Sequence, residues 1–473
     1  MENKVNYSNS ESSGDAIRSK LPQSKKLGFW NNTFILWGFV LVISSLLVGG
    51  MVGSQLPFRQ ALIVIFFAGI FNSVIAILIG VIGARTGYTS AMIYRYSYGN
   101  FGVILPNLIM ALAAVVWFAV ILNITRDAFV NLVGINIGTP LLYWGVTLVI
   151  AIIFLIPAYK TMKWIGYVDY LAAPAIVIIL IATIWGALDV GGGFTEIIAN
   201  APAASGSIMV LLTATAGGWL HGNAVISDFT RFYKTGKQAA IGLFLTYGVL
   251  MVFQYIGATI GALATGEWNV FLIMDSFGLL EITFFALFLG SWSTSMAAIY
   301  FAANLMAAPP IPEYKNEEYT RKLVLIFSWG AALFFAWYGP DQVFSFLLQF
   351  LAWLIGPIVI TVIIDYWLLP EKRTLYETEG TRPDTDINPA AYLAWIVGFL
   401  GGFFTQGFFI SLINGMVVAG IIYYSWMRLA LNRKTIPENQ LRGIFKKEPS
   451  KVSKKKQGKA SEEGNRKGDQ EEY

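Results

Sequence analysis

The sequence contains no cysteine, and this absence removes several kinds of chemistry. Disulfides, cysteine metal sites and thiol catalysis are all excluded. Histidine occurs once, as His221, and no cluster of metal-ligating residues or pair of nucleophile and base appears. We therefore expect no enzymatic activity and no cofactor.

Charge is also scarce. Charged residues make up 13% of the chain and hydrophobic residues 56%, whereas about a quarter of an ordinary globular protein is charged. Apolar runs long enough to cross a bilayer recur from end to end. The net charge of +5 comes from basic residues in the tails and in alternate loops, so it predicts membrane topology and not nucleic-acid binding. The composition predicts an all-α polytopic membrane protein.

Twelve membrane spans are predicted, within a transporter domain of residues 28–431. Residues 1–27 and 432–473 are polar and are expected to be disordered cytoplasmic tails, the second of them strongly charged. The predicted spans are about 29–54, 59–84, 103–125, 139–158, 163–188, 207–229, 238–265, 279–304, 322–338, 341–369, 391–411 and 413–431.

Lys and Arg gather in every second loop, for example Arg85 and Arg95 after the second span. The other loops are acidic or neutral, with Asp189 and Glu196 among them and Arg126 as the exception. Basic residues gather on the cytoplasmic side of membrane proteins. The alternation predicts a multi-pass protein of the cell membrane with both termini in the cytoplasm.

Residues 213–232 form an apolar segment interrupted by glycines, with Trp219 and His221 between them. Side chains two residues apart on a regular helix point about 200° apart. These two side chains can line one pocket only if the helix is interrupted, which glycine permits. Broken helices indicate binding sites in transporters, but a glycine-rich packing surface fits the same pattern.

Two other spans carry candidate site residues. In the eighth span, Gly290, Ser293 and Thr294 lie on one face of small residues, which fits either close helix packing or an oxygen-lined cation site. In the third span, Trp117 lies at mid-depth, where it fits either substrate stacking or bundle packing. The acids Asp169 and Asp365 fall near predicted span ends, where loop contact is a sufficient explanation.

Four stretches resemble the nucleobase:cation symporter-1 family, which includes cytosine permeases and hydantoin transporters. They are GFVLVISSLLVGGMVG (38–53), ARTGYTSAMIYRYSYGNFG (84–102), ISDFTRF (226–232), and WSTS (292–295) together with IDYWLL (364–369). The resemblance implies a LeuT-type fold of two inverted five-helix repeats plus two C-terminal helices, with the first and sixth spans discontinuous.

The resemblance also implies site residues. Trp117 and Trp219 look like the aromatic pair that encloses a planar heterocycle, and His221 falls at a polar substrate contact. The implied sodium site comprises the backbone carbonyls of Gly38, Leu41 and Gly290 with the hydroxyls of Ser293 and Thr294.

The chain departs from the family where polar side chains read the substrate. The family's span-3 glutamine would fall at Ala114 or Ile121, and its span-8 asparagines are replaced by residues 295–299. Either new polar contacts replace them or the ligand is less polar than cytosine. We expect the substrate site to include Ile121, Asn223, Ser295 and Gln349 as well.

The sequence therefore predicts a monomeric, sodium-coupled importer of a small planar heterocycle, such as a nucleobase. A proton-coupled transporter that uses His221 is the first alternative. A membrane receptor that kept the fold but lost transport is an alternative from another class.

Overall fold

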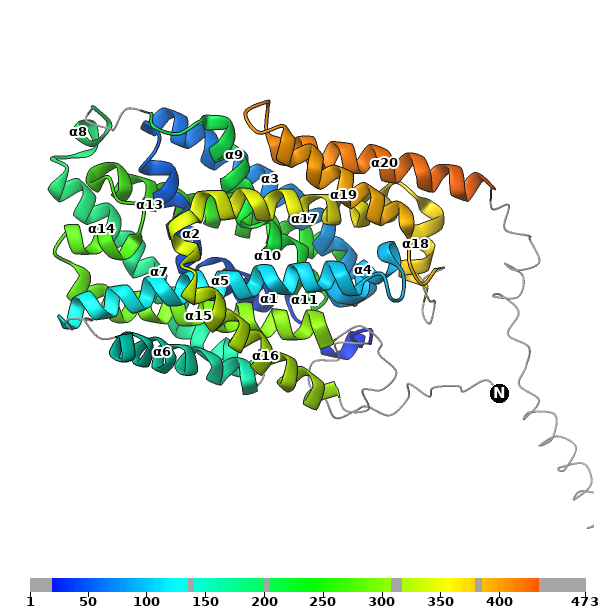
Figure 1. The fold of residues 1–473 in the computed structure, drawn as a ribbon, viewed down its shortest axis with the longest axis horizontal. Coiled ribbons are helices and arrows are strands. Elements are labelled where there is room, and N and C mark those ends of the chain that lie inside the picture. The colour runs from blue at the N-terminus through cyan, green and yellow to red at the C-terminus, as the bar shows by residue number, and fades with distance from the viewer. Residues whose placement is uncertain are drawn as a thin grey trace, which may run out of the picture. The chain divides into compact units, whose positions relative to one another are not determined.

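The computed structural model describes residues 19–134, 140–160, 162–199, 204–307, 317–378 and 385–433 (Figure 1). These residues are almost entirely helical, and no β-strand occurs among them beyond one isolated bridge between Leu27 and Tyr233. One compact unit extends to Tyr424, and a second begins at Ser425. The prediction of an all-α protein is confirmed.

The longer helices are α1 (Phe29–Val40), α2 (Ile43–Gly53), α3 (Phe58–Thr86), α5 (Ile104–Val133), α6 (Pro140–Lys160), α7 (Met162–Val190), α9 (Ile208–Gly218), α13 (Met251–Thr265), α15 (Leu280–Ala307), α16 (Glu317–Trp337), α17 (Phe344–Trp367), α19 (Pro389–Phe404) and α20 (Ser411–Arg433). Shorter elements are η1 (Gln23–Lys25), α4 (Ser90–Tyr98), α8 (Phe194–Ala199), α10 (Leu220–Ala224), α11 (Ser227–Thr230), α12 (Gly236–Leu243), the π-helical η2 (Phe244–Leu250), α14 (Val270–Ser276), η3 (Pro340–Val343) and α18 (Pro370–Glu377).

Each of the twelve predicted spans coincides with helical structure. Within the described part of the chain, nine helices are long and apolar enough to cross a membrane, or ten if α1 and α2 form one bent span. The apolar helices α9 and α19 are shorter than a full crossing. The polytopic membrane class is thus confirmed, whereas the count of twelve is not.

Most of the two predicted tails, residues 1–18 and 434–473, lies outside the described residues. The described part of the N-terminal tail contacts the helical domain. The Leu27 amide donates to the Phe232 carbonyl at 2.8 Å, and the Lys26 ammonium donates to the Ala84 carbonyl at 2.8 Å. Burial lowers the pKa of Lys26, with a smaller effect from Lys20.

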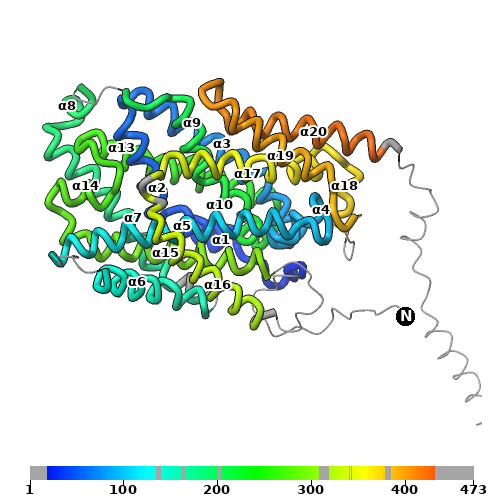
Figure 2. The backbone as a smooth tube through the Cα atoms, in the orientation of Figure 1, coloured from blue at the N-terminus to red at the C-terminus, as the bar shows by residue number. Residues whose placement is uncertain are grey.

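The long helices pack as a bundle around the two broken spans. Helix α5 packs along α15, which also contacts α7 and α16, while α17 packs against α9 and α19. Figure 2 shows α19 beside α17 at the edge of this arrangement. The short helix α10 contacts α3, α5 and α17, so the broken sixth span lies in the interior.

The first span breaks at Leu41 and Val42, where α1 and α2 meet at 53°. The Val42 amide donates to Val40, and the Ser45 amide donates to Val42. Inside a membrane such freed backbone groups need partners from the protein or from a water-filled cavity. Gln254 supplies one, because its Nε2 donates to the Val42 carbonyl at 2.9 Å.

The sixth span is interrupted at Trp219, which separates α9 from α10 with backbone angles outside the helical region (φ −99°, ψ 0°). Glycines on either side allow close packing. A methyl group at Gly217 would lie 2.3 Å from Ala352 of α17, and one at Gly222 would lie 2.6 Å from the Trp219 ring. Both sequence interpretations of this segment therefore apply, since glycines provide close packing and accompany the break.

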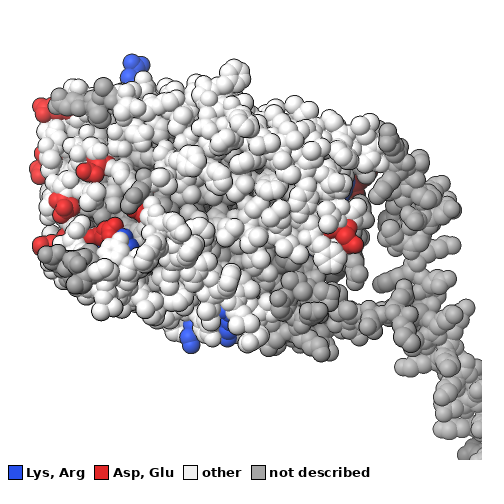
Figure 3. All heavy atoms as spheres, in the orientation of Figure 1, with Lys and Arg blue, Asp and Glu red and all other residues white. Residues whose placement is uncertain are grey.

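Acidic side chains gather at the end of the molecule that carries α8 and α14 (Figure 3). Asp189 lies at the end of α7, Glu196 in α8, Asp275 in α14 and Glu281 at the start of α15. The loops predicted to be acidic are thus brought together at one end of the helices.

Candidate functional site

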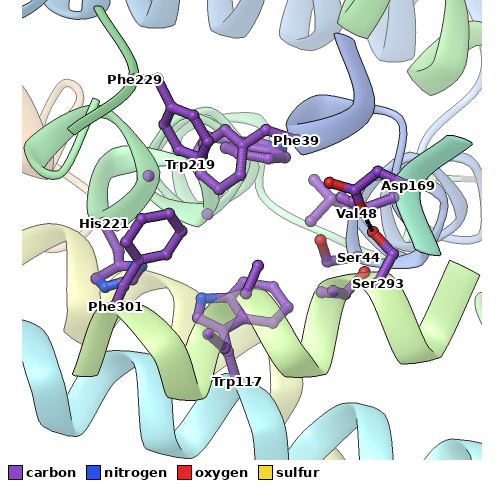
Figure 4. A pocket seen from close by; sticks show the side chains of 16 residues that line it. Phe39, Ser44, Val48, Trp117, Asp169, Trp219, His221, Phe229, Ser293 and Phe301 are labelled. Atoms are coloured by element: carbon purple, nitrogen blue, oxygen red, sulfur yellow. Dashed lines mark hydrogen bonds between the residues drawn. The ribbon is translucent and has the colours of Figure 1, made fainter. Parts of the chain in front are cut away.

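A cavity of about 60 Å³ lies where the two broken spans meet α5, α7 and α15 (Figure 4). Its lining divides into an aromatic part and an oxygen-bearing part. Aromatic and imidazole rings come from Phe39, Trp117, Trp219, His221, Phe229 and Phe301; oxygen-bearing side chains from Ser44, Asp169, Ser293 and Thr294; the remainder from Val42, Val48, Gly218, Gly222, Ala297 and Ala298.

Four rings of the aromatic part, those of Phe39, Trp219, Phe229 and Phe301, are in contact with one another. The centroid of Phe39 lies 5.4 Å from that of Trp219 in an edge-on arrangement and 4.5 Å from that of Phe229. Phe229 in turn lies 5.2 Å from Phe301. Trp117 enters from α5 on the side of the cavity opposite Trp219 (Figure 4). A flat ligand between the two indoles would have an aromatic ring on each side.

Trp219 is fixed by the first span. Its indole Nε1 donates to the Ser45 Oγ at 3.0 Å, and Ser45 Oγ donates to the Val40 carbonyl at 3.2 Å. The Ser45 hydroxyl thus connects the Trp219 indole to the break between α1 and α2. A movement of the helices at either break will therefore also move the Trp219 indole.

His221 lines the cavity on the side of Phe301 (Figure 4). Its ring is 8% exposed and hydrogen-bonds to the backbone of Met110 on α5. Its Nε2 has no hydrogen-bond partner among the described residues. Buried polar atoms are nearly always paired, so this nitrogen is available to a ligand.

The oxygen-bearing part lies at the other end of the cavity. The Ser293 hydroxyl donates to Asp169 Oδ1 at 2.6 Å, across the contact between α15 and α7. The Thr294 hydroxyl donates to the Gly290 carbonyl at 2.9 Å. Ser44, on the first turn of α2, lies near Ser293 at this end of the cavity (Figure 4).

The break in the first span also frees the carbonyls that the sequence resemblance assigns to a cation. A continuous helix would direct the Val42 amide to Gly38 and the Ser45 amide to Leu41. These amides bond to Val40 and Val42 instead. Gly38 and Leu41 therefore lose the donors that a continuous helix would give their carbonyl oxygens.

Four of the predicted substrate residues do not line this cavity. The Asn223 amide donates to Asn72 of α3 at 2.6 Å, and the Gln349 amide donates to the Ser345 carbonyl at 3.2 Å. Ile121 and Ser295 are fully buried. Packing directs all four side chains away from the lining, whereas Trp117, Trp219, His221, Ser293 and Thr294 come together there.

Five of the ten ring-bearing or oxygen-bearing lining residues are not among the predicted site residues: Phe39, Ser44, Asp169, Phe229 and Phe301. Phe301 follows Ser293 by eight residues, about two helical turns, so its position on the same face of α15 follows from the helical period. Asp169 was attributed to a span end, yet the break places the end of α1 beside it. A methyl group at Gly38 would lie 3.3 Å from Asp169 Cβ.

This arrangement suits binding better than covalent chemistry. The one imidazole of the cavity lining, His221, lies beside Phe301, whereas its one carboxyl group, Asp169, is hydrogen-bonded to Ser293 (Figure 4). These two groups are therefore not paired with each other. No group of three or more His, Asp or Glu side chains that could hold a metal occurs within the described ranges.

Comparisons with known proteins identify the family of this chain. A family model described as "Permease for cytosine/purines, uracil, thiamine, allantoin" matches residues 20–427. The cytosine permease of Escherichia coli (strain K12) is 25% identical over 417 residues, which cover 88% of this chain and 94% of the relative. The allantoin permease of Bacillus subtilis (strain 168) is 24% identical over 371 residues, covering 69% and 72%.

Solved structures show the same fold. Mhp1 in its inward facing conformation matches with a TM-score of 0.73 and 16% identity, covering 88% of this chain and 94% of Mhp1. A Na⁺-coupled sialic acid symporter in its outward-open state matches with a TM-score of 0.60 and 12% identity, covering 88% and 92%. The chain therefore has the LeuT-type fold of Mhp1, belongs to the nucleobase:cation symporter-1 family of permeases, and is a transporter and not an enzyme.

Proposed function

We propose that this permease imports a small planar heterocycle, a nucleobase or a related compound, by sodium symport with alternating access. The observation that carries the proposal is the single cavity at the two helix breaks, aromatic at one end and oxygen-bearing at the other. Relatives named as cytosine and allantoin permeases support the substrate class. An Mhp1 structure described with bromovinylhydantoin bound supports it further.

The lining supports a flat ligand with few polar groups. Stacking on aromatic side chains contributes about 1–3 kcal/mol per base in nucleic-acid complexes and tolerates different rings. The cavity offers His221 Nε2 as an unpartnered polar atom, whereas Asn223 and Gln349 bond elsewhere. A site with few hydrogen-bonding groups discriminates weakly in favour of an amide-rich base. We therefore favour a heterocycle with fewer hydrogen-bonding groups than cytosine.

The cavity volume supports a change of shape during transport. About 60 Å³ is well below the roughly 300–1,000 Å³ of typical ligand pockets. A heterocycle must therefore displace lining side chains or helices as it binds. Because Trp219 is hydrogen-bonded to Ser45 of the first span, substrate contact at the indole acts on both breaks. Rocking of the helix bundle around such a central site is the usual basis of alternating access.

Sodium coupling is supported by the hydroxyls of Ser293 and Thr294 together with the freed carbonyls of Gly38 and Leu41. Hard cations prefer oxygen ligands. If ion and substrate both favour one conformation, each increases the affinity of the other by the same factor. The protein then uses the sodium gradient to accumulate its substrate.

The loop charges support an orientation in the cell membrane with both termini in the cytoplasm. Asp189, Glu196 and Asp275 lie at the end of the helices that carries α8 and α14, and this end faces outward in our proposal (Figure 3). The basic loops at the opposite end then face the cytoplasm. The protein is proposed to act as a monomer.

The test is transport by the purified protein in liposomes. We expect a radiolabelled heterocycle to accumulate when sodium is higher outside than inside, and to exchange with unlabelled substrate in counterflow without a gradient. Exchange that is independent of sodium would contradict sodium coupling. Binding without any exchange would favour the receptor alternative.

Proton coupling through His221 is a second candidate, supported by the unpartnered Nε2 in the cavity lining. Imidazole is the side chain that most readily gains or loses a proton near neutral pH. If His221 carries the coupling proton, His221→Gln will abolish pH dependence while substrate binding remains. Under sodium coupling, Ser293→Ala with Thr294→Ala will shift the sodium dependence of uptake to much higher concentrations, and His221→Gln will leave the sodium dependence intact.

A further inference from the structure

The oxygen-bearing end of the cavity contains one carboxyl group, that of Asp169 on α7. Its exposure is intermediate, and it lines the cavity (Figure 4). The hydrogen bond from Ser293 is its one direct polar contact, and no ion pair joins it to a lysine or arginine within the described ranges. A carboxylate enclosed among packed helices is costly without a compensating charge. The position of Asp169 therefore requires an explanation.

Asp169 lies beside each element of the candidate cation site. Its Oδ1 accepts the 2.6 Å hydrogen bond from Ser293 on α15. A methyl group at Gly38 would lie 3.7 Å from its Oδ2, so the carboxyl group contacts the end of α1. One turn of α15 before Ser293, a methyl group at Gly290 would contact Ile176 of α7 and, at 3.5 Å, Ile43 of α2. Helices α1, α2, α7 and α15 thus converge at this point.

The neutral oxygens here are the hydroxyls of Ser293 and Thr294 and the carbonyls of Gly38 and Leu41. Together they offer a cation only dipoles. A carboxylate added to this set makes the ion-loaded site neutral and gives both charges a partner, which lowers the cost of burying each of them. Oxygen donors that include a carboxylate suit a hard cation.

We propose that Asp169 is a direct ligand of the coupling sodium ion and supplies the negative charge of its site. The hydrogen bond between Ser293 and Asp169 is the ion-free arrangement, and both groups turn to the ion when it binds. This inference rests on the proposed sodium coupling and adds a ligand to it. A single monovalent ion then leaves the site without net charge.

The alternative is a structural role in which Asp169 only fastens α7 to α15. Asp169→Asn separates the two roles, because the amide oxygen can still accept the hydrogen bond from Ser293 while the negative charge is lost. The matched control is Asp189→Asn on the same helix, an exposed carboxylate at the end of α7.

The experiment measures sodium binding directly, with radiolabelled sodium and purified protein in detergent and without substrate. The wild-type protein and Asp189→Asn are expected to bind sodium alike. Asp169→Asn is expected to bind at least about 10-fold more weakly, because loss of a group that only supports a metal ligand already costs about 10- to 100-fold. Heterocycle binding to Asp169→Asn at saturating sodium, followed by ligand-dependent thermal stability, shows that the variant is folded.

The outcomes separate this inference from the proposed function. If the wild-type protein binds no sodium, sodium coupling fails and this inference fails with it. If Asp169→Asn binds sodium as tightly as the wild-type protein, Asp169 is structural and sodium coupling stands. If Asp169→Asn does not fold, the test passes to Asp169→Glu, which keeps the charge. A ligand role predicts that this variant retains sodium binding with altered selectivity among lithium, sodium and potassium, and unaltered selectivity would overturn the proposal.

Discussion

The two ends of the cavity are built in different ways. At the aromatic end, the rings of Phe39, Trp219, Phe229 and Phe301 pack against one another, with Trp117 on the opposite side of the space. Among the described residues that line this end, His221 is the one with an unpartnered polar atom. At the other end, hydroxyl, carboxyl and freed carbonyl oxygens gather where the first span breaks. The first end suits a flat ring whose identity can vary, and the second suits a small hard cation.

The contrast indicates which substitutions each end of the cavity can tolerate. Stacking accepts any flat ring, so polar side chains in the aromatic wall can be lost or gained without loss of binding. Ion coordination needs several oxygens held together, so the oxygen-bearing end tolerates few changes.

The largest effect is predicted for substitutions that remove oxygen atoms from the oxygen-bearing end. We expect Ser293→Ala combined with Thr294→Ala to raise the sodium concentration for half-maximal stimulation about 100-fold, because the site loses two of its oxygen ligands. The measurement is heterocycle uptake against external sodium. Thr283→Ala, on the same helix but with its hydroxyl bonded to the Leu279 carbonyl, is the control. An unchanged sodium response in the double variant would contradict the assignment of this end.

A comparable or smaller effect is expected at the aromatic end. Trp117→Ala removes one stacking face, and we expect substrate affinity to fall about 5- to 150-fold, corresponding to roughly 1–3 kcal/mol. Affinity is measured by direct binding at saturating sodium. The control is Trp185→Ala, because Trp185 is 61% exposed on α7 and does not line the cavity. Equal losses for the two variants would mean that Trp117 only packs in the bundle.

The smallest effect concerns the connection between the two ends. Ser45→Ala removes the acceptor for the Trp219 indole, a hydrogen bond that contributes about 1 kcal/mol. We expect about a fivefold loss of substrate affinity, and a smaller increase in affinity on adding sodium. Ser54→Ala, at the far end of α2, is the control. If Ser45→Ala binds like the wild-type protein in sodium and in choline, the indole is held by ring packing alone.

Much of the fold follows from the sequence, because apolar runs separated by polar loops specify membrane helices without reference to tertiary contacts. The breaks were also predictable, since glycines accompany the interruption at Trp219 and the resemblance implies one in the first span. The number of spans does not follow from the sequence, because α9 and α19 are shorter than a full membrane crossing.

The direction of side chains in the site was harder to predict. Trp219 and His221 were selected because they share an interrupted segment, and that local argument placed both in the cavity lining. Asn223 lies in the same segment, yet it bonds to Asn72 of α3, a partner 151 residues away in the chain. The place of Asp169 in the cavity lining could not be predicted, because it depends on the contact between the end of α1 and α7. The local sequence pattern holds no information on that tertiary contact.

The most direct test of the two-ended cavity is the affinity of heterocycles for the purified protein in sodium and in choline. A panel of nucleobases, hydantoins and pyrimidine vitamin precursors is compared by ligand-dependent thermal stability, since a ligand that binds only the native state raises stability with its affinity and concentration. The account predicts that at least one heterocycle stabilises the protein more in sodium than in choline. Equal stabilisation in the two salts, by every heterocycle that binds, would contradict it.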